Sequence, residues 1–336
     1  MNKLGFVVIG RNEGKRLKDC LTSIQIFKAP IVYVDSSSTD NSVQIAESFD
    51  CDILKLDESF PLSAGRARNE GFYHLITHYP ETEFVQFVDG DCVVDKDWIN
   101  TAIKKLKSEN RIAAVLGHQT EKNPDKNIYK KLFSIEWYSP PGELSDFGNF
   151  IGNHMIKAEV FIDVNGFNPN VIAGEDSELA VRLYIKGYRI YKINCHMTTH
   201  DADINSFKEW WKRSVRAGHA IAQRAHLNGD TKYRDCVKAK RSTILWGGIV
   251  PYSSILLSIP TKGISLLFFS IYILIGYRSY RYRILLGDNK RDSILYSVNI
   301  IQAKFANFLG LIKFYINKLN NRFNVIEYQK DRIKIL

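Results

Sequence analysis

The sequence predicts an α/β protein: a mainly parallel sheet with helices on both faces, followed by a helical C-terminal region. Short apolar runs alternate with amphipathic helical patterns over residues 1–200. Strands that alternate with helices in this way build largely parallel sheets. After residue 230 the alternation gives way to a long apolar run and many basic residues. We therefore expect an α/β domain over residues 1–230 and a basic helical region over residues 231–336.

The elements of the first part follow from local periodicity. Apolar runs predict strands at residues 4–10, 31–35, 51–56, 84–89, 112–118 and 188–193. Helical spacing predicts helices over residues 15–26, near 42–49, after Asp97 and over 176–186. Residues 120–150 contain three prolines and show weak periodicity, so we expect loops and a short helix there. Ser206 and Glu209 have the spacing of a capping box and predict a long helix to about Leu227.

The composition is that of a folded protein, and its charge is uneven. Among 336 residues, 45% are hydrophobic and 24% charged, which excludes a disordered or fibrous chain. Residues 231–336 hold 18 Lys and Arg against 5 Asp and Glu, whereas residues 1–230 hold 28 against 31. This asymmetry indicates an anionic partner, either a membrane or a nucleic acid. The five cysteines are odd in number and lack metal-ligand spacing, which argues against a disulfide framework and fits a reducing compartment.

A long apolar run favours the membrane as that partner. Residues 244–277 contain a single charged residue, Lys262, and are interrupted by Pro251, Pro260 and Gly263. Two membrane crossings need ~20 residues each, so we expect a hairpin that dips into one leaflet, with a buried hairpin as the alternative. The adjacent stretch 278–283 mixes Arg with Tyr, as expected at a membrane interface. No nucleic-acid-binding module is recognisable. The first apolar run is too short for a signal peptide, so we expect attachment at the cytoplasmic face of the cell membrane.

Acidic residues follow two of the expected strands. Asp89 and Asp91, separated by a glycine, come directly after the strand 84–89. Two carboxylates there can bind one Mg²⁺ or Mn²⁺ ion, which would neutralise a diphosphate leaving group; a solvated acidic turn is the alternative. Asp35 ends the strand 31–35 and could accept hydrogen bonds from a base or a ribose, although an ordinary turn would use the same residues. Ligands bind beyond the carboxyl ends of such strands.

Further candidates lie on the expected helices. Arg66 and Arg68 begin a helix and could bind phosphate or a nucleobase. Glu175 and Asp176 precede another helix, and one of them could take a proton from an acceptor hydroxyl. We also consider His200 as a further metal ligand or phosphate contact, and Arg213, beside Trp210 and Trp211, as a diphosphate contact. Structural roles are the alternative for each.

Taken together, six motifs resemble the family 2 glycosyltransferases, which have the GT-A fold. They occur in the expected order between residue 4 and about residue 220: N-E-G (12–14), V-D-S-S-S-T-D (34–40), A-G-R-A-R-N-E-G (64–71), F-V-D-G-D (87–91), G-E-D-S-E-L-A-V-R-L (174–183) and W-W-K-R (210–213). Many members have a second Asp where this chain has Ser36, and W-W-K-R only loosely resembles the Q-x-x-R-W motif of processive synthases. A processive polymerase is therefore not expected.

The resemblance implies roles for some of these residues. Asp35 would contact the nucleotide, Asp91 with Asp89 would hold the metal on the donor diphosphate, and Asp176 would be the catalytic base. Transfer would invert the anomeric carbon. The hypothesis is a metal-dependent hexosyltransferase that uses Mn²⁺ or Mg²⁺, a UDP-sugar donor and a lipid-linked saccharide acceptor in cell-surface polysaccharide synthesis. A nucleotidyltransferase and a non-catalytic nucleotide-sugar-binding scaffold are the alternatives.

Overall fold

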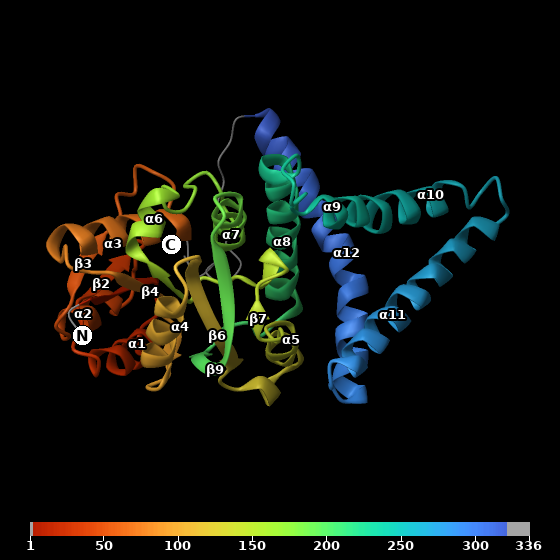
Figure 1. The fold of residues 1–336 in the computed structure, drawn as a ribbon. Coiled ribbons are helices and arrows are strands. Elements are labelled where there is room, and N and C mark those ends of the chain that lie inside the picture. Colours follow the sequence, from red (N-terminus) through yellow and green to blue (C-terminus); the bar gives the residue numbers. More distant parts are fainter. Residues whose placement is uncertain (1–2, 321–336) are drawn as a thin grey trace. The chain divides into compact units, whose positions relative to one another are not determined.

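The computed structural model describes residues 3–320, which fall into two compact units (Figure 1). The first unit comprises residues 3–123 and 137–202, and the second comprises residues 124–136 and 203–320. Residues 321–336, the end of the expected basic region, lie outside the described residues. Each unit is considered by itself below.

The first unit is built on a nine-stranded sheet within the described residues. The strand order is β3-β2-β1-β4-β8-β6-β9-β5, with β7 paired to β9. The strands are β1 (Leu4–Gly10), β2 (Ile31–Asp35), β3 (Asp52–Lys55), β4 (Phe84–Asp89), β5 (Cys92–Val94), β6 (Ile112–Glu121), β7 (Gly142–Glu143), β8 (His154–Lys157) and β9 (Arg189–His200).

The sheet is mixed, so the expectation of a mainly parallel sheet is correct for only part of it. Strands β1 to β4 are parallel to their neighbours in the order β3-β2-β1-β4. Strand β8, which the sequence did not indicate, lies antiparallel between β4 and β6. A four-residue strand carries too short a pattern to be recognised, and its direction depends on where the preceding loop returns to the sheet.

Helices pack on this sheet and account for its uninterrupted apolar strands. They are α1 (Lys15–Gln25), α2 (Ser42–Glu47), α3 (Ala64–His78), α4 (Trp98–Ser108), α6 (Ala158–Asp163) and α7 (Glu175–Ile185), with a short turn η2 (Phe147–Asn149). Helix α3 lies directly on β1 and β2, because a Cβ atom at Gly71 would come within 2.6 Å of Val7 and 2.7 Å of Val34. This close approach brings the first turn of α3 to the carboxyl edge of the sheet.

The second unit is helical. It contains α5 (Ile128–Glu136), α8 (Phe207–Asn228), α9 (Val237–Ile244), α10 (Val250–Leu256), α11 (Ile271–Leu285) and α12 (Lys290–Leu319), with the shorter η1 (Pro124–Lys126), η3 (Leu245–Ile249) and η4 (Ile264–Ser270). The predicted capping box is confirmed, since Ser206 and Glu209 each bond the other's backbone N–H. Helices α8 and α12 pack closely through glycines: a Cβ at Gly218 or Gly310 would overlap the backbone of the other helix.

The apolar run 244–277 forms two helical arms joined by a turn, called the hairpin below. Its first arm continues from α9 through η3 into α10, and its second arm runs through η4 into α11 (Figure 1). Residues 257–263 form the turn between the arms. No helix in the described part of the chain has the length and apolar character needed to cross a membrane. Contact of the hairpin with a membrane stays a prediction.

Candidate functional site

The two acidic strand ends lie on either side of β1 at one edge of the sheet. Strand β2 pairs with β1 so that Asp35 lies opposite Gly10, and β4 pairs with β1 so that Asp89 lies opposite Ile9. All three strands are parallel, so their carboxyl ends meet at this edge. A crevice for a ligand is expected at such an edge.

Asp35 is held in place by its own strand and by the loop that follows. The carboxylate is buried and accepts hydrogen bonds from the Tyr33 hydroxyl at 3.0 Å and from the Ser38 N–H at 2.9 Å. This loop is tied to the one after β1: the Asn12 N–H donates to Ser38 Oγ, and the Asn12 side-chain oxygen accepts from the Thr39 N–H. The two loops therefore form a fixed wall around the end of β2.

A buried arginine joins two motifs that are far apart in the sequence. Arg68 on α3 donates to Asp89 Oδ1 at 2.7 Å and to Glu175 Oε1 at 2.8 Å. Its side chain is 4% exposed, and that of Glu175 is 9% exposed. The arginine thus fixes the end of β4 to the first turn of α7. Asp176, beside Glu175, lies in the same first turn, where the helix dipole stabilises a carboxylate.

Asn153 and Gly152 support this network, and sequence reasoning missed both. Asn153 accepts from the Asp89 N–H at 2.8 Å and donates to Gln119 Oε1 at 2.8 Å. A Cβ at Gly152 would collide with the Arg68 guanidinium. Both residues immediately precede β8, and the only sequence signal was the run I-G-N-H before a strand too short to recognise.

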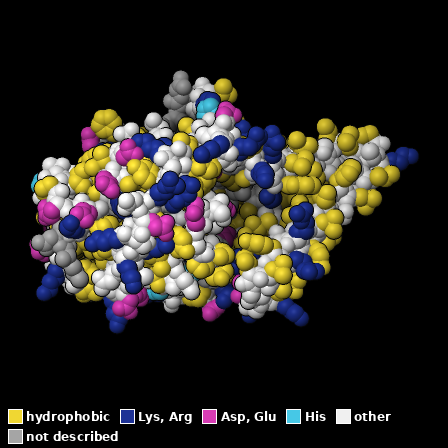
Figure 2. Space-filling model, in the orientation of Figure 1, with side chains coloured by type: hydrophobic (Ala, Val, Ile, Leu, Met, Phe, Trp, Pro, Cys, Tyr) yellow, Lys and Arg dark blue, Asp and Glu magenta, His cyan; other side chains and the backbone are white. Residues whose placement is uncertain are grey.

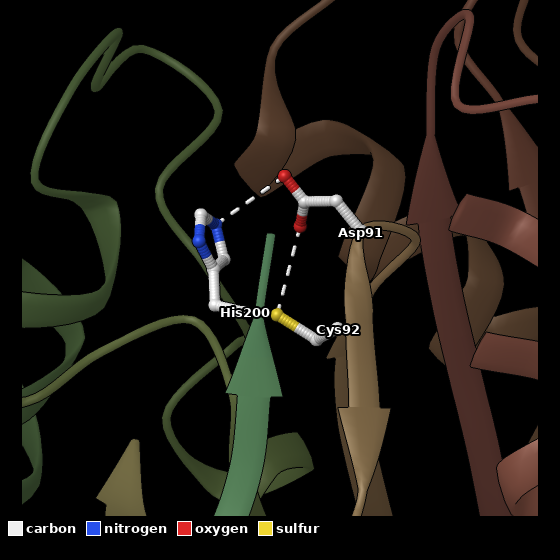
Figure 3. A group of neighbouring side chains, drawn as sticks. All are labelled: Asp91, Cys92 and His200. Carbon is white, nitrogen blue, oxygen red and sulfur yellow. Dashed lines mark hydrogen bonds and ion pairs between the residues drawn. The ribbon is translucent and has the colours of Figure 1, made fainter. Parts of the chain in front are cut away.

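Asp91 and His200 form a second cluster at this edge (Figure 3). Strand β5 pairs with the end of β9, which places His200 opposite Cys92. One carboxylate oxygen of Asp91 lies 3.3 Å from His200 Nε2, and the other accepts a hydrogen bond from the Cys92 thiol at 3.6 Å (Figure 3). Glu121 at the end of β6 lies 3.7 Å from His200 Nδ1. The ring is therefore enclosed by two carboxylates.

The charges of this cluster depend on one another. Burial by itself would lower the pKa of His200, but the adjacent Asp91 carboxylate outweighs burial and raises it to about 10. Burial would likewise raise the pKa of Asp91, but the charge of His200 outweighs it and lowers the value to about 2. Burial raises the pKa of Cys92 well above its usual range, so the thiol stays protonated. The imidazolium thus neutralises a strongly acidic environment.

The donor atoms of this cluster fit a divalent cation. One ligand atom each from Asp91, Cys92 and His200 lies within 4.8 Å of the others. His200 Nδ1 forms no hydrogen bond and lies 3.7 Å from Glu121. His200 would have to lose a proton to bind a cation, because a metal ligand must be a neutral imidazole. The Asp91 carboxylate is the kind of ligand that both Mn²⁺ and Mg²⁺ favour.

The other predicted site residues have contacts of a different kind. Arg66, whose side chain is 14% exposed, donates from α3 to the carbonyl groups of Asp57 and Phe60 and pairs with Glu70. Arg213 belongs to the second unit, where it contacts Glu136 at 3.1 Å and lies over the Phe133 ring. The first unit thus brings together Arg68, Asp89, Glu175 and Asp176, and separately Asp91 and His200.

Comparison with known proteins supports a family 2 glycosyltransferase. Residues 6–169 match the family model described as "Glycosyl transferase family 2". The chain is 25% identical over 240 residues to poly-beta-1,6-N-acetyl-D-glucosamine synthase of Staphylococcus aureus, a match that covers 65% of this chain and 55% of the synthase. It is 23% identical over 198 residues to the probable glycosyltransferase YdaM of Bacillus subtilis, covering 55% of this chain and 46% of YdaM. The chain thus spans about half the length of these relatives.

Two solved structures share the fold. The crystal structure of S. aureus TarS 1-349 superposes with a TM-score of 0.52 at 17% identity, covering 98% of this chain and 97% of that one. The mannosyltransferase PcManGT from Pyrobaculum calidifontis, solved in complex with GDP-Man and Mn²⁺, gives a TM-score of 0.53 at 18% identity, covering 91% and 87%. At this identity the likeness concerns the fold alone.

Proposed function

We propose that this chain, whose residues 6–169 match the family 2 glycosyltransferases, transfers a hexosyl group from a UDP-sugar to an acceptor hydroxyl with inversion of the anomeric carbon. The observation that carries the proposal is the Arg68 bridge. It joins the strand-end carboxylate Asp89 to the helix turn that holds Asp176, although 87 positions separate Asp89 from Asp176 in the sequence. The residues proposed for donor binding and for proton removal therefore lie at the same edge of the sheet.

Each residue at this edge has a part in the proposed reaction. Asp35 would accept hydrogen bonds from the nucleoside, and Asp91, supported by Asp89 and His200, would hold Mn²⁺ or Mg²⁺. A bound cation would supply charge neutralisation of the diphosphate leaving group. Asp176 receives the proton as the acceptor oxygen bonds to the anomeric carbon and the bond to the nucleoside diphosphate breaks. The Glu175 carboxylate is paired with Arg68, and an ion-paired carboxylate is a weaker base. We therefore assign the base role to Asp176.

The acceptor that we propose is a lipid-linked saccharide in cell-surface polysaccharide synthesis, at the cytoplasmic face of the cell membrane. The polysaccharide synthase named above supports the part in polysaccharide synthesis, and the apolar hairpin of the second unit supports an acceptor held at a membrane. Arg66 and Arg213 remain candidates for donor contacts, although both have protein partners.

A panel of nucleotide sugars tests the reaction. Purified chain with Mn²⁺ or Mg²⁺ should release a nucleoside diphosphate from one donor, and a chelator should abolish the release. The anomeric configuration of the product, read by NMR, tests inversion. Release of pyrophosphate would instead identify a nucleotidyltransferase. Nucleotide binding without turnover, with every donor and a lipid-linked acceptor mixture supplied, would identify a non-catalytic scaffold.

Two variants test the assigned roles. Asp176→Asn should lower kcat by roughly 10²- to 10⁴-fold, the usual contribution of a general base, while nucleotide binding stays unchanged. Asp91→Ala should abolish metal-dependent nucleotide binding as well as transfer. Asp163→Asn is the control, because this carboxylate of the same unit is on the surface and pairs with Lys186. Transfer at the wild-type rate by Asp176→Asn would exclude that residue as the base.

A further inference from the structure

We propose that the hairpin of residues 244–277 docks into the headgroup and upper acyl region of an anionic lipid bilayer, with both arms on the same side of the membrane. This inference is independent of the sugar-transfer reaction. It rests on which face of each arm is exposed, on the hydrogen bonds of its polar groups, and on the charges at the bases of the arms.

Each arm exposes an apolar stripe at helical spacing. Along the first arm, Ile249, Tyr252, Leu256 and Ile259 follow one another at intervals of three or four residues, and all are exposed. The second arm exposes Ile264, Leu267, Phe268, Ile273, Leu274 and Tyr277. The opposite faces are buried: Gly247 and Gly248 contact Phe308 of α12, and Gly276 contacts Ile301. Among the described residues of this unit, the outward faces of the arms are therefore the uncovered ones.

Exposure is greatest next to the turn. Leu256, Ile259 and Leu267 are 77%, 88% and 70% exposed. Figure 2 shows hydrophobic side chains over most of the visible face of the arms. Monomeric soluble proteins rarely expose contiguous apolar patches larger than a few hundred Å², and larger ones mark interaction sites. A partner that covers this surface must itself be apolar.

The polar groups of the hairpin favour lipid over protein as that partner. Every serine and threonine between residues 253 and 270 donates its hydroxyl hydrogen to a main-chain carbonyl of the hairpin: Ser253, Ser254, Ser258, Thr261, Ser265 and Ser270. Lipid requires such internal pairing, because the acyl region offers no hydrogen bonds. A protein interface instead uses about one hydrogen bond across it per 100–200 Å², and these hydroxyls could take part in one only as acceptors.

The charges at the bases of the arms match anionic headgroups. Lys238 and Arg241 extend the stripe of the first arm toward α9, and Arg278 and Arg281 extend that of the second; all four are exposed. Figure 2 shows Lys and Arg side chains gathered toward these bases. The three acidic residues between positions 231 and 320 form ion pairs with basic residues other than these four: Arg224–Asp235, Arg283–Asp288 and Lys131–Asp292. Basic residues beside an apolar surface each add attraction to an anionic leaflet.

Two further features set the depth of insertion. Tyr277 lies between the apolar and the basic parts of the second arm, and Tyr280 and Tyr282 alternate with the arginines that follow. Aromatic side chains are enriched at membrane interfaces. Lys262, the one charge of the run, lies in the turn. Its ammonium group must reach water or a headgroup, which keeps the turn within one leaflet.

Vesicle flotation with the purified full chain tests the proposal. The chain should float with vesicles of phosphatidylcholine mixed with phosphatidylglycerol, and less with phosphatidylcholine alone. The triple variant Leu256→Gln/Ile259→Gln/Leu267→Gln should lower the partition coefficient at least tenfold, since each exposed side chain contributes to burial. The matched control Leu309→Gln/Ile312→Gln/Ile316→Gln changes exposed apolar residues of α12 and should bind as the wild type does.

A charge variant separates the headgroup contribution from the apolar one. Lys238→Gln/Arg241→Gln/Arg278→Gln/Arg281→Gln should reduce binding to the anionic vesicles to the level seen with phosphatidylcholine alone. Equal flotation of the wild type and the Leu256 triple variant would overturn the proposal. The proposal would also be overturned if the wild type did not bind vesicles but formed dimers, and if the same triple variant abolished those dimers. The surface would then bind a second copy of the chain. Nucleoside diphosphate release should persist in the triple variant, which separates this test from that of the reaction.

Discussion

Removal of the Arg68 charge is the sharpest test of how the candidate site is held together. Arg68→Met keeps an unbranched chain of similar length, so packing beside the Phe167 ring is largely retained. The change leaves the Glu175 carboxylate, 9% exposed, without its cation, and removes one partner from Asp89, 32% exposed. Breaking a buried ion pair in this way costs about 3–5 kcal/mol.

The magnitude follows mainly from Glu175. The contact of 2.8 Å to Arg68 is the more buried of the two pairs, and a charge pair near 4 Å contributes about 4 kcal/mol at an effective dielectric constant of 20. Asp89 contributes less, because a third of its side chain is in contact with solvent. We therefore expect the free energy of unfolding to fall by about 4 kcal/mol, a large share of the 5–15 kcal/mol typical of a folded protein.

Urea unfolding followed by circular dichroism at neutral pH measures this loss. Glu175→Gln in the Arg68→Met background removes the uncompensated charge, so the double variant should regain about 2 kcal/mol of the loss, taken as half of the charge-pair energy. Arg189→Met is the control, because the Arg189–Glu143 pair is 36% and 55% exposed and should contribute under about 1 kcal/mol. A loss below about 1 kcal/mol for Arg68→Met, or no recovery in the double variant, would refute the reasoning.

Two further perturbations address the folded units. Burial, with a smaller effect from Arg68, lowers the pKa of His154 to about 3 in the folded state. The His154 ring therefore stays neutral in the folded protein, whereas in the unfolded chain it gains a proton below pH ~6.5. The free energy of unfolding should consequently fall by about 2 kcal/mol between pH 7.5 and pH 5. Urea unfolding at pH 7.5 and at pH 5 measures this difference in the free energy of unfolding. The difference should be about 2 kcal/mol smaller in His154→Phe than in the wild type. An equal difference in the two proteins would contradict the assignment. Gly310→Ala should cost about 3 kcal/mol by overpacking, since its Cβ would overlap the Val215 carbonyl on α8, whereas Leu309→Ala on the exposed side of α12 should change thermal stability by only ~0.5 kcal/mol. Equal melting temperatures for the two α12 variants would argue against the close helix contact.

Sequence periodicity was informative wherever an element is long and one-sided. The strands at residues 4–10, 31–35 and 84–89 were predicted with their observed bounds, because uninterrupted apolar runs are typical of strands covered on both faces. The long helix after Ser206 was found from its capping box. The strand at 112–118 continues to Glu121 in the structure, since its last residues are polar and carry no apolar signal.

The site was predictable only in its separate pieces. Motif order pointed to Asp35, Asp89, Asp91, Glu175 and Asp176, but no spacing in the sequence shows that Arg68 contacts two carboxylates at once. Asn153 escaped notice because its partners, Asp89 and Gln119, lie on other strands. Such contacts depend on strand order, and strand order is a long-range property of the sheet.

By itself, the sequence determined the alternation of strands and helices, the uneven charge, the apolar hairpin and the acidic strand ends, because each of these depends on residues that are close together in the chain. Only the tertiary structure decided that β8 enters the sheet antiparallel, that residues 124–136 belong with the helical unit, and that Asp91 meets His200. These outcomes depend on contacts between residues far apart in the chain. Local preferences cannot specify them, since the same strand or helix can pack against several neighbours with similar burial of its apolar face.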